Sequence, residues 1–124
     1  MKLLILVPFA VAALAGSAFA AEPFKTVKTD KGDVLAGDKG MTLYTFKKDT
    51  AGESYCYDKC ATNWPPAIAA SDAVAEGAYS LVTRKDGAKQ WAKDGMPLYY
   101  WIKDTKEGDT TGDGVNEVWD VAKP

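Results

Sequence analysis

Two cysteines, Cys56 and Cys60, carry the most distinctive chemistry in this chain of 124 residues. Residues four apart face the same side of a helical turn, so the two thiols can meet. Outside the cytoplasm an even number of cysteines usually forms disulfides, and so small a ring adds only about 2 kcal/mol in the chain-entropy model. The alternatives are thiol–disulfide or electron-transfer chemistry and metal ligation by the reduced thiols.

Two metals fit parts of the sequence. Copper(I) prefers soft sulfur ligands, so reduced cysteines joined by the thioether of Met41 or Met96 would suit it. The spacing of Asp109, Asp113 and Asp120 partly follows a calcium-binding loop, although the twelfth position of such a loop favours a bidentate Glu. Glycine-rich turn chemistry explains the same acidic loop without calcium, and packing explains Met41 and Met96 without copper, so neither metal is required.

The chain contains no histidine. Its absence excludes nucleophile–histidine pairs, histidine-ligated zinc and histidine-ligated haem. No other set of residues forms a recognisable catalytic constellation. We therefore expect a protein that is not an enzyme.

An internal repeat supplies the elements that position these residues. Segment 40–49 returns at 95–104 with Gly, Met, Leu, Tyr, an aromatic residue, Lys and Asp in register, at an offset of 55 residues. The same offset relates Trp64 to Trp119. We expect two β-rich repeats, about 24–68 and 79–124, to pack with pseudo-two-fold symmetry, because neither half would bury its aromatic face alone.

The centre of each repeat reads as a strand. Segments 42–46 and 97–101 are rich in aromatic and β-branched residues. Tyr44 and Phe46 are two residues apart and share one face of the strand. Asp49 and Asp104 follow the two motifs; a carboxylate there can cap a turn, or it can act as a ligand or an acid.

The remaining local signals complete a small, mainly β domain. Asp and Gly residues at 29–33 and 84–88 favour hairpin turns. Near the cysteines we expect a short helical turn over 55–63, with Ser54 as its N-cap and two prolines at its end.

The first 20 residues read as a signal peptide. Lys2 precedes an apolar run, and Ala18-Phe19-Ala20 is a small-x-small cleavage site. The expected mature protein is a single domain, 21–124, with no membrane span. It carries 14 basic and 17 acidic residues, a net charge of −3, which disfavours nucleic acid and anionic membranes as partners.

Together the motifs resemble a known family. Tyr44-x-Phe46-x-x-Asp49 and Tyr99-x-Trp101-x-x-Asp104 match the Tyr-x-(Phe/Trp/Tyr)-x-x-Asp motif of the bacterial secreted-repeat family, which is also described as predicted lipoproteins. Cys56-x-x-x-Cys60-Ala61 and Trp64-Pro65-Pro66 extend the resemblance over nearly all of the mature chain. The resemblance implies export and a tandem architecture, and it implies no particular reaction.

One feature departs from the family pattern. Many such proteins are lipoproteins, but Ser17 stands where a lipidated cysteine would follow Leu14-Ala15-Gly16, so we expect a soluble periplasmic or secreted protein. The leading hypothesis is an exported binding or interaction module whose partner is an envelope protein or a small ligand. The alternative is a periplasmic redox, electron-transfer or metal-binding accessory that uses Cys56 and Cys60.

Overall fold

The structure is a computed structural model that describes residues 23–124, so the predicted signal peptide lies outside the described residues. Most of the regular structure is in short strands, which confirms the mainly β prediction. In chain order the elements are β1 (Lys25–Thr29), β2 (Gly32–Ala36), η2 (Asp38–Gly40), β3 (Tyr44–Phe46), α1 (Lys59–Asn63), β4 (Tyr79–Thr83), β5 (Lys89–Lys93), β6 (Met96–Pro97), η3 (Val115–Glu117) and β7 (Trp119–Val121). No helix of the described part is long and apolar enough to cross a membrane.

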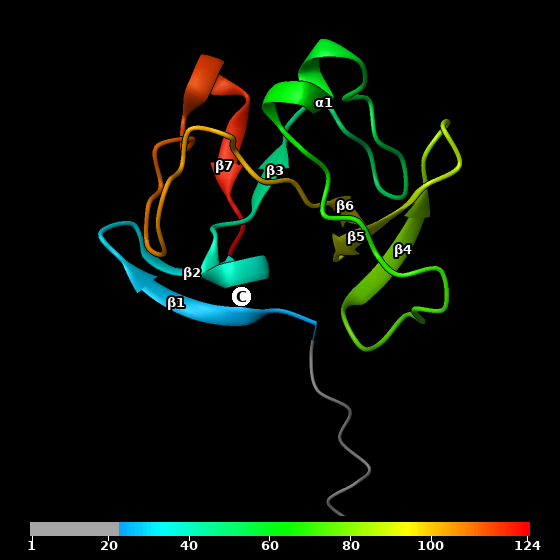
Figure 1. Cartoon of the computed structure of the whole chain (residues 1–124), viewed down its shortest axis with the longest axis horizontal. Helices are drawn as coiled ribbons and strands as arrows, with labels where there is room; N and C mark the ends of the chain where they lie inside the picture. Colours follow the sequence, from blue (N-terminus) through cyan, green and yellow to red (C-terminus); the bar gives the residue numbers. More distant parts are fainter. Residues whose placement is uncertain (1–22) are drawn as a thin grey trace, which may run out of the picture.

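The strands form three small antiparallel sheets, β1-β2, β3-β7 and β4-β5-β6. Figure 1 shows β3 and β7 side by side between the other two sheets. The predicted hairpin turns are present, and each contains a glycine in the left-handed region, Gly32 at φ 88° and Gly87 at φ 90°.

The hairpin of the second repeat is one residue longer than the hairpin of the first. Val27 pairs with Val34 in the first repeat, whereas Val82, at the 55-residue offset, pairs with Gln90 in the second. Gln90 therefore occupies the place of Val34. A buried polar side chain in one repeat replaces a buried apolar one in the other.

The repeats exchange their ends across the pseudo-two-fold axis. Strand β3 of the first repeat pairs with β7, the last strand of the second, and Tyr99 of the second repeat bridges Pro66 at the end of the first. On the axis, the backbone N–H groups of Tyr44 and Tyr99 each donate to the other's carbonyl, at 2.8 and 3.0 Å. Each repeat therefore completes its partner, as the symmetric packing prediction requires.

Two buried clusters lie on opposite faces of the central strands. Tyr44 and Phe46 belong to the first cluster, with Trp64 and Trp119. Leu43, the intervening residue, belongs to the second. The predicted division of the strand into two faces is confirmed.

Two of the predicted elements are shorter in the structure than the sequence indicated. The helical turn expected over 55–63 is helical only in α1, because Asp58 has φ 56° and interrupts the path. Ser54 does not cap it; the side chain is buried and bonded to Tyr99. The second central strand is reduced to β6 and isolated bridges at Tyr99, because Tyr99 pairs with both Tyr44 and Pro66.

Candidate functional site

The tyrosine and aspartate of the repeated motif meet across the repeats, not within one. The Tyr44 hydroxyl donates to Asp104 Oδ2 at 2.6 Å, and the Tyr99 hydroxyl donates to Asp49 Oδ2 at 2.7 Å. All four side chains are buried. The two tyrosine–aspartate pairs, Tyr44–Asp104 and Tyr99–Asp49, are therefore the reason for the motif's spacing.

Each aspartate also holds the start of a long loop. The second oxygen of Asp49 accepts the Tyr55 backbone N–H at 2.7 Å. The corresponding oxygen of Asp104 accepts the Thr111 N–H at 3.0 Å and its hydroxyl at 2.6 Å. Both carboxylates therefore accept backbone N–H groups, as a cap does, but from residues six and seven positions further along the chain. The bond to tyrosine adds a role that the turn-cap interpretation did not include.

Burial dominates the electrostatics of the pairs. It raises the pKa of Asp49, opposed by the hydrogen bonds from Tyr99 and Tyr55 and by the charge of Arg84. Burial and the bond to Asp104 raise the pKa of Tyr44, and burial likewise raises the pKa of Tyr99. Both phenols therefore stay protonated through the physiological range and donate to their carboxylates.

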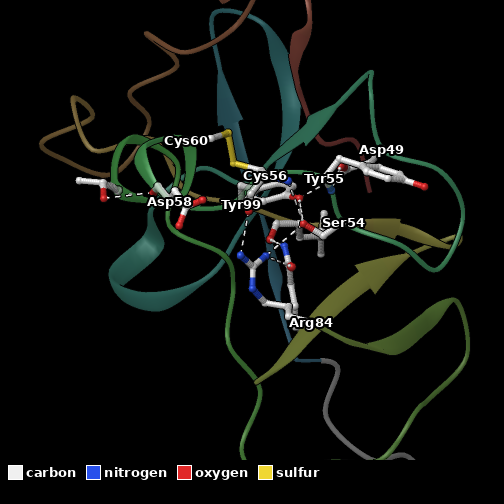
Figure 2. Close-up of a disulfide and its surroundings, with 11 residues drawn as sticks. Asp49, Ser54, Tyr55, Cys56, Asp58, Cys60, Arg84 and Tyr99 are labelled. Carbon is white, nitrogen blue, oxygen red and sulfur yellow. Dashed lines mark hydrogen bonds between the residues drawn. A yellow bond between two sulfur atoms is a disulfide. The ribbon is translucent and has the colours of Figure 1, made fainter. Parts of the chain in front are cut away.

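Arg84 distinguishes the Tyr99–Asp49 pair from its counterpart. Figure 2 shows its guanidinium reaching toward Ser54 and Cys56. It donates to Ser54 Oγ at 3.1 Å, to Gln90 Oε1 at 2.7 Å and to the Cys56 carbonyl at 2.8 Å. Ser54 in turn bonds the Tyr99 hydroxyl at 2.6 Å. A buried cation thus connects one pair to the cysteine loop, and the place of Gln90 in the other repeat is taken by Val34.

Sequence reasoning missed Arg84. Its side chain is 1% exposed, although it lies at the edge of a hairpin turn where arginine is normally solvated. Tyr57 covers it, with the guanidinium carbon 4.3 Å from the ring centroid. The only usable signal was Gln90, a polar residue at a strand position where Val34 is apolar.

The predicted disulfide is present between Cys56 and Cys60. Cys56 is fully buried, with its carbonyl fixed by Arg84 and its N–H directed at Ser54 Oγ. Cys60, in α1, is half-buried. The bond therefore joins a fixed interior segment to α1, and it leaves no thiolate for a metal in this state.

Four stacked rings run through the axis and form an aromatic column. Ring centroids lie 4.3 Å apart for Phe46 and Trp119, 3.7 Å for Trp119 and Trp64, and 4.0 Å for Trp64 and Trp101. The two ends, Phe46 and Trp101, are equivalent at the repeat offset, as are the two central tryptophans. The column is therefore symmetric in position but not in its end residues.

An open hollow of about 530 Å³ lies beside the column and is lined in part by residues of α1 and η3. Its polar lining is Lys48, Lys59, Asn63 and Asn116. Its apolar lining is Phe46, Cys60, Trp64, Val118 and Trp119. Both repeats contribute, and the lining contains two lysines and no acidic residue.

The carboxylates of the proposed calcium loop have separate partners. Asp109 accepts from the Lys106 ammonium at 2.7 Å, Asp113 accepts from the Val121 N–H at 2.9 Å, and Asp120 lies 3.7 Å from the Lys47 ammonium. Among residues 23–124, no three acidic or cysteine side chains form a group that could hold a metal ion. The geometry therefore gives the calcium prediction no support.

Comparison with known proteins agrees with the internal repeat. The model of a family described as a secreted repeat of unknown function matches residues 25–68 and 80–123. No curated protein and no solved structure matches the chain. The matched segments cover most of the chain and coincide with the two halves that exchange tyrosine–aspartate contacts. The chain therefore belongs to this family of secreted repeats.

Proposed function

We propose that this protein is a non-catalytic, exported binding module of the periplasm or cell envelope, and that it holds a small organic anion in the hollow between α1 and η3. The observation that carries the proposal is the lining itself, which contains two lysines, two asparagine side chains and no carboxylate. The chain as a whole has more acidic than basic residues, whereas the lining of the hollow carries only positively charged side chains.

The lysines of the hollow are available to a ligand. Lys48 and Lys59 are exposed, and within the described residues no ion pair involves either of them; other lysines, such as Lys47 with Asp120, are paired. Their ammonium groups therefore attract an anion without first breaking a salt bridge. Long-range attraction of this kind weakens as ionic strength rises.

The floor of the hollow adds an apolar requirement. Trp64 and Trp119 are stacked on one another, so they present edges to the hollow and not open faces. The positive edge of an aromatic ring favours oxygen acceptors and other rings. A carboxylate attached to a flat apolar group fits this combination of edges, amides and ammonium groups better than a simple inorganic anion does.

An amide NMR titration with benzoate, acetate and phosphate tests the proposal. We expect benzoate to shift the side-chain amides of Asn63 and Asn116 and to bind more tightly than acetate or phosphate. Replacing both lysines, Lys48→Ala with Lys59→Ala, should weaken benzoate about tenfold, since two exposed ion pairs contribute roughly 0.7 kcal/mol each.

The repeat provides a matched control. Lys103 is the equivalent of Lys48 at the 55-residue offset and does not line the hollow, so Lys103→Ala should leave benzoate affinity unchanged. Equal loss in Lys103→Ala and Lys48→Ala, or no shift at Asn63 and Asn116 with any of the three anions, would reject the hollow as the site.

A second candidate function is thiol–disulfide exchange, which the position of Cys60 favours. The half-buried Cys60 lines the hollow while Cys56 is fully buried. An external thiolate would attack the Cys60 sulfur, and Cys56 would leave as a thiolate. A disulfide potential near that of glutaredoxins, about −200 to −230 mV, supports this function, and one below about −300 mV makes the bond structural.

A further inference from the structure

We propose that the aromatic column is also a one-electron relay, which carries an oxidising equivalent from Trp101 to the buried tyrosine–aspartate pairs. This function is separate from ligand binding in the hollow. It rests on three features that coincide in the structure: stacked indoles, an oxidisable end near the surface, and phenols bonded to carboxylates.

The first feature is continuity. From Trp101 the column passes through Trp64 to Trp119, with centroid separations of 4.0 and 3.7 Å and interplanar angles of 24° and 3°. The ring centroids of Tyr44 and Trp64 are 5.4 Å apart, and those of Tyr99 and Trp119 are 5.2 Å apart. Electron transfer weakens steeply with distance, so rings this close exchange an electron readily.

The second feature is direction. Trp101 is half-buried, whereas Phe46 at the other end is 8% exposed. A phenyl ring is far harder to oxidise than an indole, so only the Trp101 end accepts an oxidising equivalent. The Lys103 ammonium lies 6.0 Å from the Trp101 ring. Its positive charge disfavours a radical cation on Trp101 relative to the more distant Trp64, and so drives the equivalent inward.

The third feature is a place for the proton. Oxidation makes a phenol strongly acidic, and each buried phenol already donates to a carboxylate, Tyr99 to Asp49 at 2.7 Å and Tyr44 to Asp104 at 2.6 Å. With an organic peroxyl radical as oxidant, the radical gains one electron from the column and one proton from water, so that it becomes a hydroperoxide and the water becomes hydroxide. The tyrosine loses one electron and passes its proton to the aspartate, which leaves a neutral tyrosyl radical beside a carboxylic acid.

Flash photolysis tests the relay in the purified full-length protein. Photogenerated tris(bipyridine)ruthenium(III) serves as the one-electron oxidant, and transient absorption with freeze-quench electron paramagnetic resonance distinguishes tryptophan from tyrosyl radicals. Every variant carries Tyr55→Phe, because Tyr55 is 49% exposed and would be oxidised directly. We expect an early tryptophan radical that decays as a tyrosyl radical forms, with a several-fold lower tyrosyl yield in Tyr44→Phe with Tyr99→Phe.

Two substitutions at the ends of the column provide the matched test. Trp101→Phe gives this end the residue that the other repeat has, and it should lower the buried tyrosyl yield several-fold. Phe46→Trp should open a second route and restore the yield in the Trp101→Phe background. An unchanged yield in Trp101→Phe overturns the relay. A tryptophan radical in the parent protein that decays without forming a tyrosyl radical overturns it as well, even if Trp101→Phe fails to fold.

Discussion

The Tyr44–Asp104 and Tyr99–Asp49 pairs are equivalent in position and different in their surroundings. The Tyr44 hydroxyl also accepts the Gly112 N–H at 3.1 Å, and a side chain at Gly112 would collide with the Tyr44 and Trp64 rings. The Tyr99 hydroxyl bonds Ser54, which Arg84 holds. The hydroxyl of Tyr44 thus accepts from a backbone N–H, whereas the hydroxyl of Tyr99 bonds a serine that a buried arginine holds.

This difference distinguishes the features that both repeats share from the features that only one repeat contains. The cross-repeat hydrogen bond and the central tryptophans occur twice, so they belong to the architecture. Arg84, Gln90 and the disulfide occur once, around the loop that leads into α1 and supplies Lys59, Cys60 and Asn63 to the hollow. The added network therefore fixes the side of the hollow that bears the cysteines.

The largest expected effect comes from the shared architecture. Trp64 and Trp119 are 4% and 2% exposed and stack on each other. Trp64→Ala and Trp119→Ala should each lower the free energy of unfolding by about 3–5 kcal/mol. Urea denaturation measures both, and similar losses are expected because the two residues are equivalent. A large loss in one variant alone would show that the two tryptophans contribute unequally to stability, although their positions are equivalent.

A smaller effect should come from the network found in one repeat. Arg84→Thr installs the residue found at the equivalent position of the first repeat. It removes the donor to Gln90 Oε1 and to the Cys56 carbonyl, and one of the hydrogen bonds to Ser54 Oγ. We expect a loss of about 2–4 kcal/mol in urea denaturation. Adding Gln90→Val, the other first-repeat residue, should recover part of this loss, since it removes a buried amide. A double variant less stable than Arg84→Thr would contradict the network's role.

The smallest effect is alkaline destabilisation through the two phenols. Burial raises the pKa of Tyr44 and of Tyr99 above that of an unfolded tyrosine, about 10. The unfolded chain therefore loses these protons first, so stability is intact below about pH 10 and falls above it, by up to about 1.4 kcal/mol per pH unit for each phenol. Tyr44→Phe and Tyr99→Phe should each reduce the slope of stability against pH from about 9 to 11. A slope unchanged in both variants would mean that neither phenol is protected from titration.

Much of the fold could be predicted from the sequence, because the 55-residue repeat and the residue types in the hairpin turns can be recognised without the structure. The exchange between repeats could not. Both repeats carry the same motif, so the sequence reads identically whether Tyr44 bonds Asp49 of its own repeat or Asp104 of the other. The structure decides for the cross-repeat partner in both cases.

The candidate site was less predictable than the fold. The motif residues and the cysteine pair were found from type and spacing, and both lie near the axis. The hollow was not predicted, because Lys48, Lys59 and Asn116 lie in separate surface segments that only the folded chain brings together. Ser54 was misread as a helix cap because serine is common there; the long-range contact with Arg84 outweighs that local preference.

Double-mutant cycles on the motif test most directly whether the repeats complete each other. The cycles combine Tyr44→Phe and Tyr99→Phe, each in turn, with Asp49→Asn and Asp104→Asn, and urea denaturation supplies the free energies. Cross-repeat exchange predicts coupling of about 0.5–3 kcal/mol for Tyr44 with Asp104 and for Tyr99 with Asp49. It predicts additivity within about 0.5 kcal/mol for Tyr44 with Asp49 and for Tyr99 with Asp104. Coupling within each repeat and additivity between repeats would contradict the exchange on which the site is built.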